Sequence, residues 1–159
     1  MDRIIDKIVA LLTANVKTSR GIKAIYKGDI FLIPEVSIPA IMVSPDQTTT
    51  TTATNTQDYN IFTINVTVVL DARTYFNTSP TEFTGLFIAA QIMEERESDT
   101  SNEPKADTIL KTIRSELDSD TDFSLRADPT IDYGFSDNRA FPTVEANMQI
   151  QVLSKVYTR

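Results

Sequence analysis

The sequence contains no histidine and no cysteine, and its glycines (Gly21, Gly28, Gly85 and Gly134) are far apart. Without histidine or cysteine, a Ser–His–Asp triad and its Cys–His relatives are impossible. The usual zinc sites also lose both of their favoured ligands. Phosphate-binding loops and dinucleotide fingerprints need clustered glycines, so neither is present. The common nucleophilic and nucleotide-dependent enzymes are therefore excluded.

Long apolar runs and a secretory leader are also missing. No run approaches the ~20 apolar residues that a membrane-spanning helix needs, and the opening residues 1–7 are too polar for a signal peptide. We expect a soluble chain that is made in a cytoplasm, with no disulfides. The length of 159 residues, with 41% hydrophobic and 23% charged residues, is typical of a single globular domain spanning 1–159.

Charge is unevenly distributed along the chain, whose net charge is −7. Residues 1–28 contain six bases and two acids, whereas residues 92–122 contain ten acids and four bases. Two solvated faces would explain this pattern. Complementary patches for head-to-tail self-association would explain it as well. The overall acidity argues against tight DNA binding, which needs a basic surface, but not against a passage through which DNA slides.

Hydrophobic periodicity predicts a helix followed by strands. Residues 2–16 repeat apolar side chains at helical spacing, as in Ile4, Ile8 and Leu12. Short strands are expected at 22–27 and 39–44. The clearest strand is Tyr59–Ala72, in which alternate residues form one apolar face: Phe62, Ile64, Val66, Val68 and Leu70.

The second half of the chain predicts helices and then strands. Helices are expected over Phe83–Glu97 and from Lys105 to about residue 117. Short strands are expected at 123–125 and 131–135. The last strand, Thr143–Tyr157, again alternates apolar and polar residues. This order predicts an α+β fold, with helices packed on one face of a mostly antiparallel sheet that contains a long hairpin loop.

Polar residues on the expected strands favour an interface. The polar faces of the two long strands are rich in Thr, Asn and Gln rather than Lys and Glu, which suits a hydrated subunit interface. The threonine run Thr48–Thr52 is expected to be the solvated tip of a long hairpin or a flexible loop, and one hypothesis is that it becomes ordered on a neighbour. The interface candidates are Thr48, Thr50, Thr52, Thr54, Asn65, Thr67, Gln149 and Gln151.

Other candidate chemistry is sparse: Lys23, Tyr26 and Lys27 are a weak signal for nucleic-acid contact, and the remaining candidates are carboxylates. Glu94 and Glu95 are a possible acid–base pair, although a solvated helix end explains them better. The run Asp118–Asp122 repeats the first half of a calcium loop, but Phe123 and Pro129 occupy the positions that need Gly and Glu. We therefore expect no catalytic residue, no metal and no cofactor.

The order of elements as a whole resembles the tail terminator (tail completion) proteins of long-tailed bacteriophages. The features are the opening helix in 1–16, the strand pair around Ile41 and Tyr59–Ala72 with a long polar loop between, the helical segment 83–117, and the alternating final strand 144–159. The acidic region 94–122 is longer than is usual in that family. The resemblance covers nearly the whole chain, but no diagnostic motif carries it.

This resemblance implies a non-enzymatic virion protein of the tail and neck. It implies a homo-oligomeric ring, expected to be hexameric, that caps the tail tube protein, contacts the head–tail connector and lets DNA pass through its lumen without specific binding. Another neck component, such as a head completion or connector protein, is the nearest alternative. A carboxylate-dependent hydrolase and a small-molecule or peptide binding module are more distant ones.

Overall fold

The computed structural model describes residues 1–52, 58–76, 85–118, 120 and 122–156. Along these residues the elements follow in the order α1 (Asp2–Asn15), β1 (Ala24–Lys27), a 3₁₀ turn (Glu35–Ser37), β2 (Ala40–Thr52), β3 (Asp58–Asp71), α2 (Ala72–Phe76), α3 (Gly85–Glu94), α4 (Ile109–Asp118), β4 (Phe123–Leu125), β5 (Thr130–Ser136) and β6 (Thr143–Val156).

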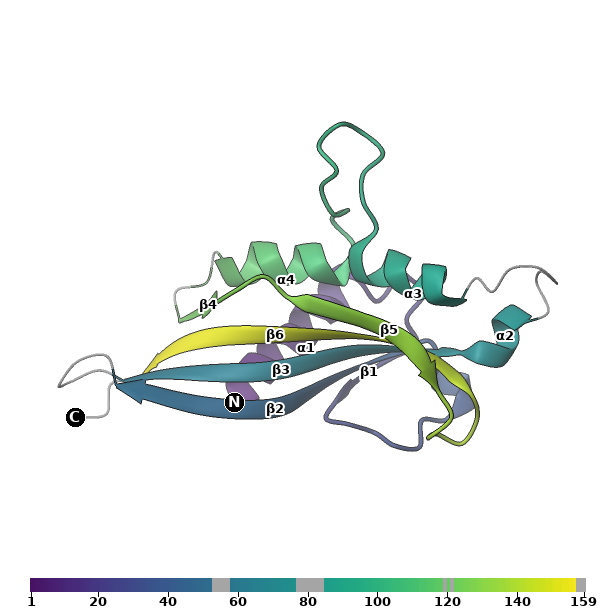
Figure 1. Ribbon diagram of the computed structural model, residues 1–159, viewed down its shortest axis with the longest axis horizontal. Helices are drawn as coiled ribbons and strands as arrows, with labels where there is room; N and C mark the ends of the chain where they lie inside the picture. The colour runs from purple at the N-terminus through teal and green to yellow at the C-terminus, as the bar shows by residue number, and fades with distance from the viewer. Residues whose placement is uncertain (53–57, 77–84, 119, 121, 157–159) are drawn as a thin grey trace.

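The strands form one curled sheet with β3 in its middle (Figure 1). β3 pairs antiparallel with β2 on one side and with β6 on the other. β1 runs parallel to β2 at one edge. Beyond β6, both β5 and β4 pair antiparallel with it, β5 against residues 143–149 and β4 against residues 152–154.

The helices α1, α3 and α4 cover one face of this sheet (Figure 1). The α+β prediction, a mostly antiparallel sheet with helices on one face, is confirmed. Alternation along β3 and β6 places their apolar side chains toward these helices. The resulting core includes side chains with no exposed surface from both layers: Ile4, Ile8, Leu12, Ile64, Val66, Ile113, Leu117, Met148 and Ile150.

A smaller apolar cluster lies on the opposite face, at one end of the sheet. The segment 28–39 folds over Ala40, Met42 and Val69 and buries Ile33 and Ile38 against them. The rest of that face has no cover among the described elements. We call this uncovered part the open face; its central residues are Ser44, Asn65, Thr67, Asn147, Gln149 and Gln151.

The second long helix begins later than the sequence predicts. Pro104 pairs with Arg96 in an isolated bridge instead of starting a helix at Lys105. The helix starts at Ile109, where the Thr108 hydroxyl accepts the backbone N–H of Lys111 at 3.2 Å as an N-terminal cap. The expected helix 83–97 likewise ends early, at Glu94. The residues between the helices form a projection from the helix layer (Figure 1).

We call residues 95–107 the projecting hairpin. Its two limbs are joined by backbone hydrogen bonds from Glu97 N–H to the Glu103 carbonyl (2.8 Å) and from Lys105 N–H to the Glu95 carbonyl (2.7 Å). The residues between Glu97 and Glu103 are exposed. Among the described residues, no helix is long and apolar enough to cross a membrane.

Truncation of Ile113 tests whether α4 is packed as described. Ile113 has no exposed surface and lies in the main core, so Ile113→Ala leaves a cavity beneath the helix. The expected loss in free energy of unfolding is about 2–5 kcal/mol, measured by urea denaturation. Lys111→Ala, on the same helix but half-exposed, is the matched control and should change stability by about 0.5 kcal/mol or less. Equal effects from both would contradict the packing.

Candidate assembly surface

The open face brings together half of the predicted interface residues. Asn65 lies directly opposite Gln149 on the β3–β6 ladder, and Gln151 lies opposite Thr63, one row further along the same face. Thr67 occupies the neighbouring row on the other side. Asn65 and Thr67 are half-buried, whereas Gln149 is exposed. The structure therefore places Asn65, Thr67, Gln149 and Gln151 on one continuous surface.

Hydrogen bonds between side chains hold this surface in place. The Thr67 hydroxyl donates to Asn147 Oδ1 at 2.9 Å, and Asn147 Nδ2 donates to Asn65 Oδ1 at 3.5 Å. Gln149 Nε2 reaches Asp46 Oδ2 at 3.5 Å. Because amides both donate and accept, such a row can bind a second protein directly or through water. An uncovered sheet face of this kind can make an assembly contact without a large apolar patch.

The predicted threonines Thr48 and Thr50 do not belong to the open face. The β2–β3 register shifts between Pro45 and Gln47, so Asp46 is an extra residue in β2. Such a bulge reverses which face the following side chains point to. Thr48 and Thr50 therefore point to the helix side of the sheet, away from the other interface candidates.

The threonine run is not the tip of the hairpin either. Residues 48–52 belong to β2 and pair with residues 58–62 of β3. The expectation that Thr48–Thr52 forms a solvated tip or loop is wrong, because the threonines complete a strand ladder, as their preference for extended structure allows. Thr54 and the side chain of Thr52 lie outside the described residues.

Arg139 fixes one end of the open face. Its guanidinium donates to the carbonyl oxygens of Ile30 and Phe31, at 2.5 and 3.2 Å, and to Glu145 Oε1 at 2.9 Å. The Thr143 hydroxyl donates to the other oxygen of the same carboxylate at 2.8 Å. Arg139 therefore joins segment 28–39 to β6. Nothing in the sequence around Arg139 indicates this long-range contact.

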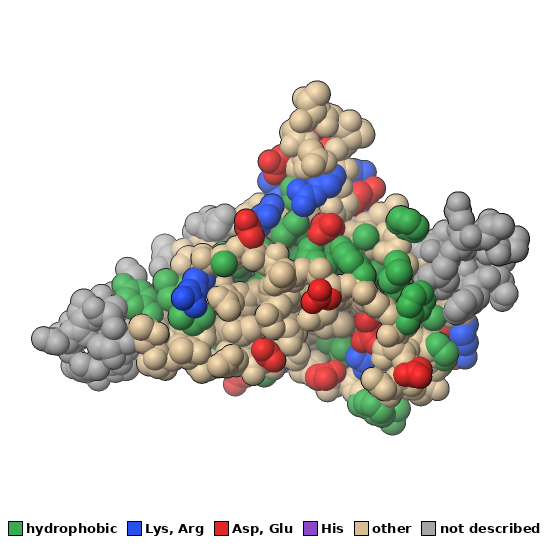
Figure 2. Space-filling view, viewed as in Figure 1, with side chains coloured by type: hydrophobic (Ala, Val, Ile, Leu, Met, Phe, Trp, Pro, Cys, Tyr) green, Lys and Arg blue, Asp and Glu red, His purple; other side chains and the backbone are tan. Residues whose placement is uncertain are grey.

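A cluster of charged residues joins the projecting hairpin to the end of α1. Arg20 donates to Glu95 Oε2 and to Asp107 Oδ1, both at 2.6 Å, and Lys105 Nζ lies 3.1 Å from Glu95 Oε1. Charged side chains gather at the base of the projecting hairpin in Figure 2. Hydrogen bonds from Arg20, and then from Lys105, lower the pKa of the Glu95 carboxyl. We call Arg20, Glu95, Lys105 and Asp107 the ionic brace.

Part of the uneven charge along the sequence is paired within the chain. Besides Arg20, the basic first segment supplies Lys7, which pairs with Asp120, and Arg3, which lies 2.5 Å from Asp122. Three of the six bases of the first segment thus meet four of the ten acids of the middle segment inside one molecule.

The carboxylates considered for catalysis, Glu94 and Glu95, and Asp120 of the run considered for calcium all have neighbours that they contact or act on. Glu94 lies close enough to Tyr133 to help raise the pKa of that side chain. Glu95 is part of the ionic brace, and its lowered pKa keeps it ionised, whereas a general acid needs a raised pKa. Asp120 accepts the backbone N–H groups of Asp122 and Phe123, and so closes the turn after α4. In the described part of the chain, no three acidic side chains are grouped so as to hold a metal ion.

Aromatic side chains are exposed beside β5, where the sequence predicts only a short strand. Phe87 of α3 is 69% exposed, Phe135 is 58% exposed and Tyr133 is 38% exposed. Hydrophobic side chains gather beside β5 on the α3 side in Figure 2. Burial, and then the charge of Glu94, raises the pKa of Tyr133 to about 12. The alternation of Ile131, Tyr133 and Phe135 predicts that these side chains share one face of a strand. It does not predict that Tyr133 and Phe135 remain exposed on that face.

Comparison of the chain with models of known protein families gives no match, and comparison with curated proteins gives none either. The proposals below therefore depend on the sequence pattern and on the geometry of the described residues.

Replacing Arg20 by methionine tests the ionic brace. Arg20→Met removes the partner of Asp107 and leaves Glu95 with Lys105 alone, and we expect about 1–2 kcal/mol less stability at pH 7. The pKa of Glu95 is lowered in the folded protein, so its stabilising contribution is complete above the unfolded pKa and is lost as pH falls through the folded value. The variant should therefore lose less stability on acidification than the parent, as measured by thermal unfolding between pH 3 and 7.

Lys17→Met is the control for this prediction, because Lys17 lies in the same segment and makes no ion pair with a described residue. An acid dependence of unfolding that is the same in the parent and in Arg20→Met would contradict a stabilising role for the ionic brace.

Proposed function

We propose that this chain is a structural subunit of a ring that caps the end of a bacteriophage tail tube, stops its growth and joins the tail to the neck. The single observation that carries the proposal is the open face. Three helices cover one side of the sheet, while the other side keeps a row of hydrogen-bonding amides and hydroxyls uncovered. A second protein surface is the cover that such a face fits best.

The order and length of the strands support the same proposal. An opening helix, a long hairpin, a helical segment and a long final strand are the features that resemble tail terminators, and β2, β3 and β6 form one extended ladder. The sheet is thus longer than its helical cover, and the free end of the ladder reaches beyond α4 in Figure 1. Such a reach suits contact with a neighbouring ring.

The acidity of the chain suits the centre of a tail. Proteins that grip DNA neutralise phosphates with lysine and arginine, whereas this chain has a net charge of −7. Several of its bases are already paired with its own carboxylates. A ring of such subunits would let DNA pass through without holding it.

Incubation with tail tubes tests the function directly. Purified protein is added to growing tubes of the cognate tail tube protein, and tube length and tube ends are examined by negative-stain electron microscopy. We expect rings at one end of each tube and an end to elongation. Binding to filled heads alone would favour another neck component, and tubes that grow on unchanged would refute the proposal.

A charge placed on the open face should weaken capping without unfolding the subunit. Gln149 is exposed, and Gln149→Arg puts a guanidinium in the centre of this surface. Even beside the Asp46 carboxylate, a guanidinium buried in a contact loses more hydration free energy than the ion pair returns, so the concentration needed for capping should rise by about tenfold or more. The melting temperature should stay within ~2 °C of the parent value.

Ser98→Arg is the matched control, because Ser98 is exposed on the projecting hairpin, on the other side of the molecule. This variant should cap tubes as the parent does. Equal weakening by both substitutions would show that the open face has no special part in capping.

A further inference from the structure

The sheet contains a band in which five strands lie side by side, and β1 and β5 form the two ends of this band. The paired registers can be followed straight across it. One row consists of Tyr26, Met42, Thr67, Asn147 and Asp132. β1 and β5 therefore lie at the same height on opposite edges, although their residues are far apart in the sequence.

Both ends of the band are open among the described residues. No further strand pairs with the outer side of β1 or of β5. β5 contains no proline and no lysine, and it pairs with β6 without a register shift. By contrast, the uncovered part of β2 carries Pro45 and the bulge at Asp46, which are devices that block strand addition. β5 lacks these devices, and β1 has no proline and no register shift and carries a single lysine, Lys27, at its end.

Strand direction allows one copy to continue the sheet of another. β1, β2 and β6 run one way, and β3 and β5 run the other way. If the next copy is placed beside the first in the same orientation, its β1 meets β5 antiparallel. This is the commoner kind of strand pairing, and it repeats head to tail, as a closed ring requires.

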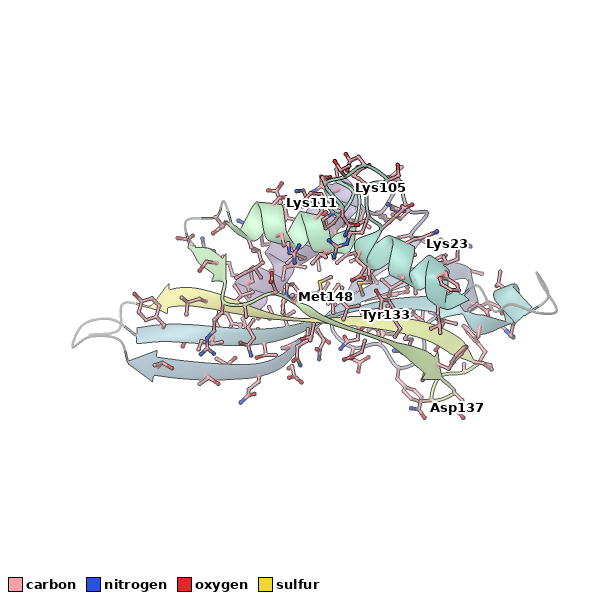
Figure 3. All side chains as sticks on the ribbon, turned by 45° about the horizontal axis from the view of Figure 1, so that its top comes forward. Lys23, Lys105, Lys111, Tyr133, Asp137 and Met148 are labelled. Carbon is pink, nitrogen blue, oxygen red and sulfur yellow. The ribbon has the colours of Figure 1, made fainter. Side chains whose placement is uncertain are left out.

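Charge favours this arrangement over a two-fold one. β5 carries exposed Asp132, and exposed Asp137 follows it, whereas exposed Lys23 precedes β1 and exposed Lys27 is its last residue. Pairing β5 with β5 of a second copy would bring two sets of aspartates together, which is unfavourable. Pairing β5 with β1 in this register brings Asp137 toward Lys23 of the next copy, whereas Lys27 lies on the helix side, 2.9 Å from Asp6, and Asp132 lies on the open face. Figure 3 shows Lys23 and Asp137 at the same end of the sheet.

The exposed aromatic residues would gain a cover in the same contact. Phe87, Tyr133 and Phe135 lie on the helix side of the β5 edge. On the helix side of β1 stands α1. A copy that adds its β1 to β5 would therefore place its own α1 against these rings. Backbone pairing, charge and apolar burial all favour the same partner.

We propose that β5 of one copy pairs antiparallel with β1 of the next copy, so that the sheets of neighbouring subunits join edge to edge around the ring. This inference rests on the proposed function only in that the copies form a closed ring. The edges of β5 and β1 would meet between neighbouring copies. The open face would then remain free to contact the tail tube or the neck.

Engineered cysteines test the contact, because the chain has no cysteine of its own. Tyr26 and Asp132 occupy the same row. Opposed residues of an antiparallel pair lie about 4.5–5.5 Å apart at Cα, which is within disulfide range. Tyr26→Cys and Asp132→Cys are made as single variants, mixed, oxidised and analysed by non-reducing electrophoresis. We expect a dimer band in the mixture, with each variant alone staying at the monomer position.

A second pair of cysteine substitutions is needed because Tyr26 packs against the smaller apolar cluster, so that Tyr26→Cys could destabilise the fold. Lys23→Cys and Phe135→Cys continue the same register three residues further along and are both exposed. One chain that carries both changes should give a reducible ladder of oligomers. Thr49→Cys with Ser98→Cys, exposed positions away from both edges, should give no ladder.

The outcomes separate this inference from the proposed function. If neither the mixture of Tyr26→Cys with Asp132→Cys nor the double variant Lys23→Cys/Phe135→Cys cross-links, while tube capping is intact, the edge-to-edge contact is overturned and the function stands. Cross-links in Tyr26→Cys alone or in Asp132→Cys alone indicate a two-fold contact and also overturn it. Cross-links in the mixture and in the double variant without any capping support the contact and refute the function.

Discussion

The structure depends on the central position of β3. This strand is paired with β6 along all of its 14 residues and with β2 along most of them. Its helix-facing side chains Ile64, Val66 and Val68 have no exposed surface. Because a strand's side chains alternate, the residues between these point to the other side of the sheet. There, segment 28–39 buries Val69, and Asn65 and Thr67 form the polar open face.

That alternation explains which parts of the fold could be predicted from the sequence. β3 and β6 are long and regular, so their limits and their buried faces follow from the pattern of residues alone. The bulge at Asp46 could not be predicted, because it depends on how β2 pairs with a distant strand. It is also the reason that Thr48 and Thr50 lie apart from the open face, whereas Asn65, Thr67 and Gln149, on unbroken strands, share it.

Ion pairs between residues far apart in the sequence were the other feature that the sequence did not predict. The sequence shows a basic beginning and an acidic middle, but not that Arg20 reaches Glu95 and Asp107. Likewise, the start of α4 at Thr108 depends on a local cap and on the hairpin before it. Both features arise from pairing between segments, which composition and periodicity do not encode.

The threonine run has a further consequence for the free end of the ladder. A slip of one residue along a strand moves its apolar side chains from the buried face to the exposed face. This cost usually fixes the register of the strand. Within Thr48–Thr52, a slip by one residue replaces threonine by threonine on both faces. These residues therefore contribute almost nothing to choosing their own alignment, which must be imposed by the buried pairs earlier in β2, such as Val43 with Val66. The end of the ladder consequently presents the same threonine side chain at each successive position of β2. A partner that binds there would meet the same side chain at every step along the strand.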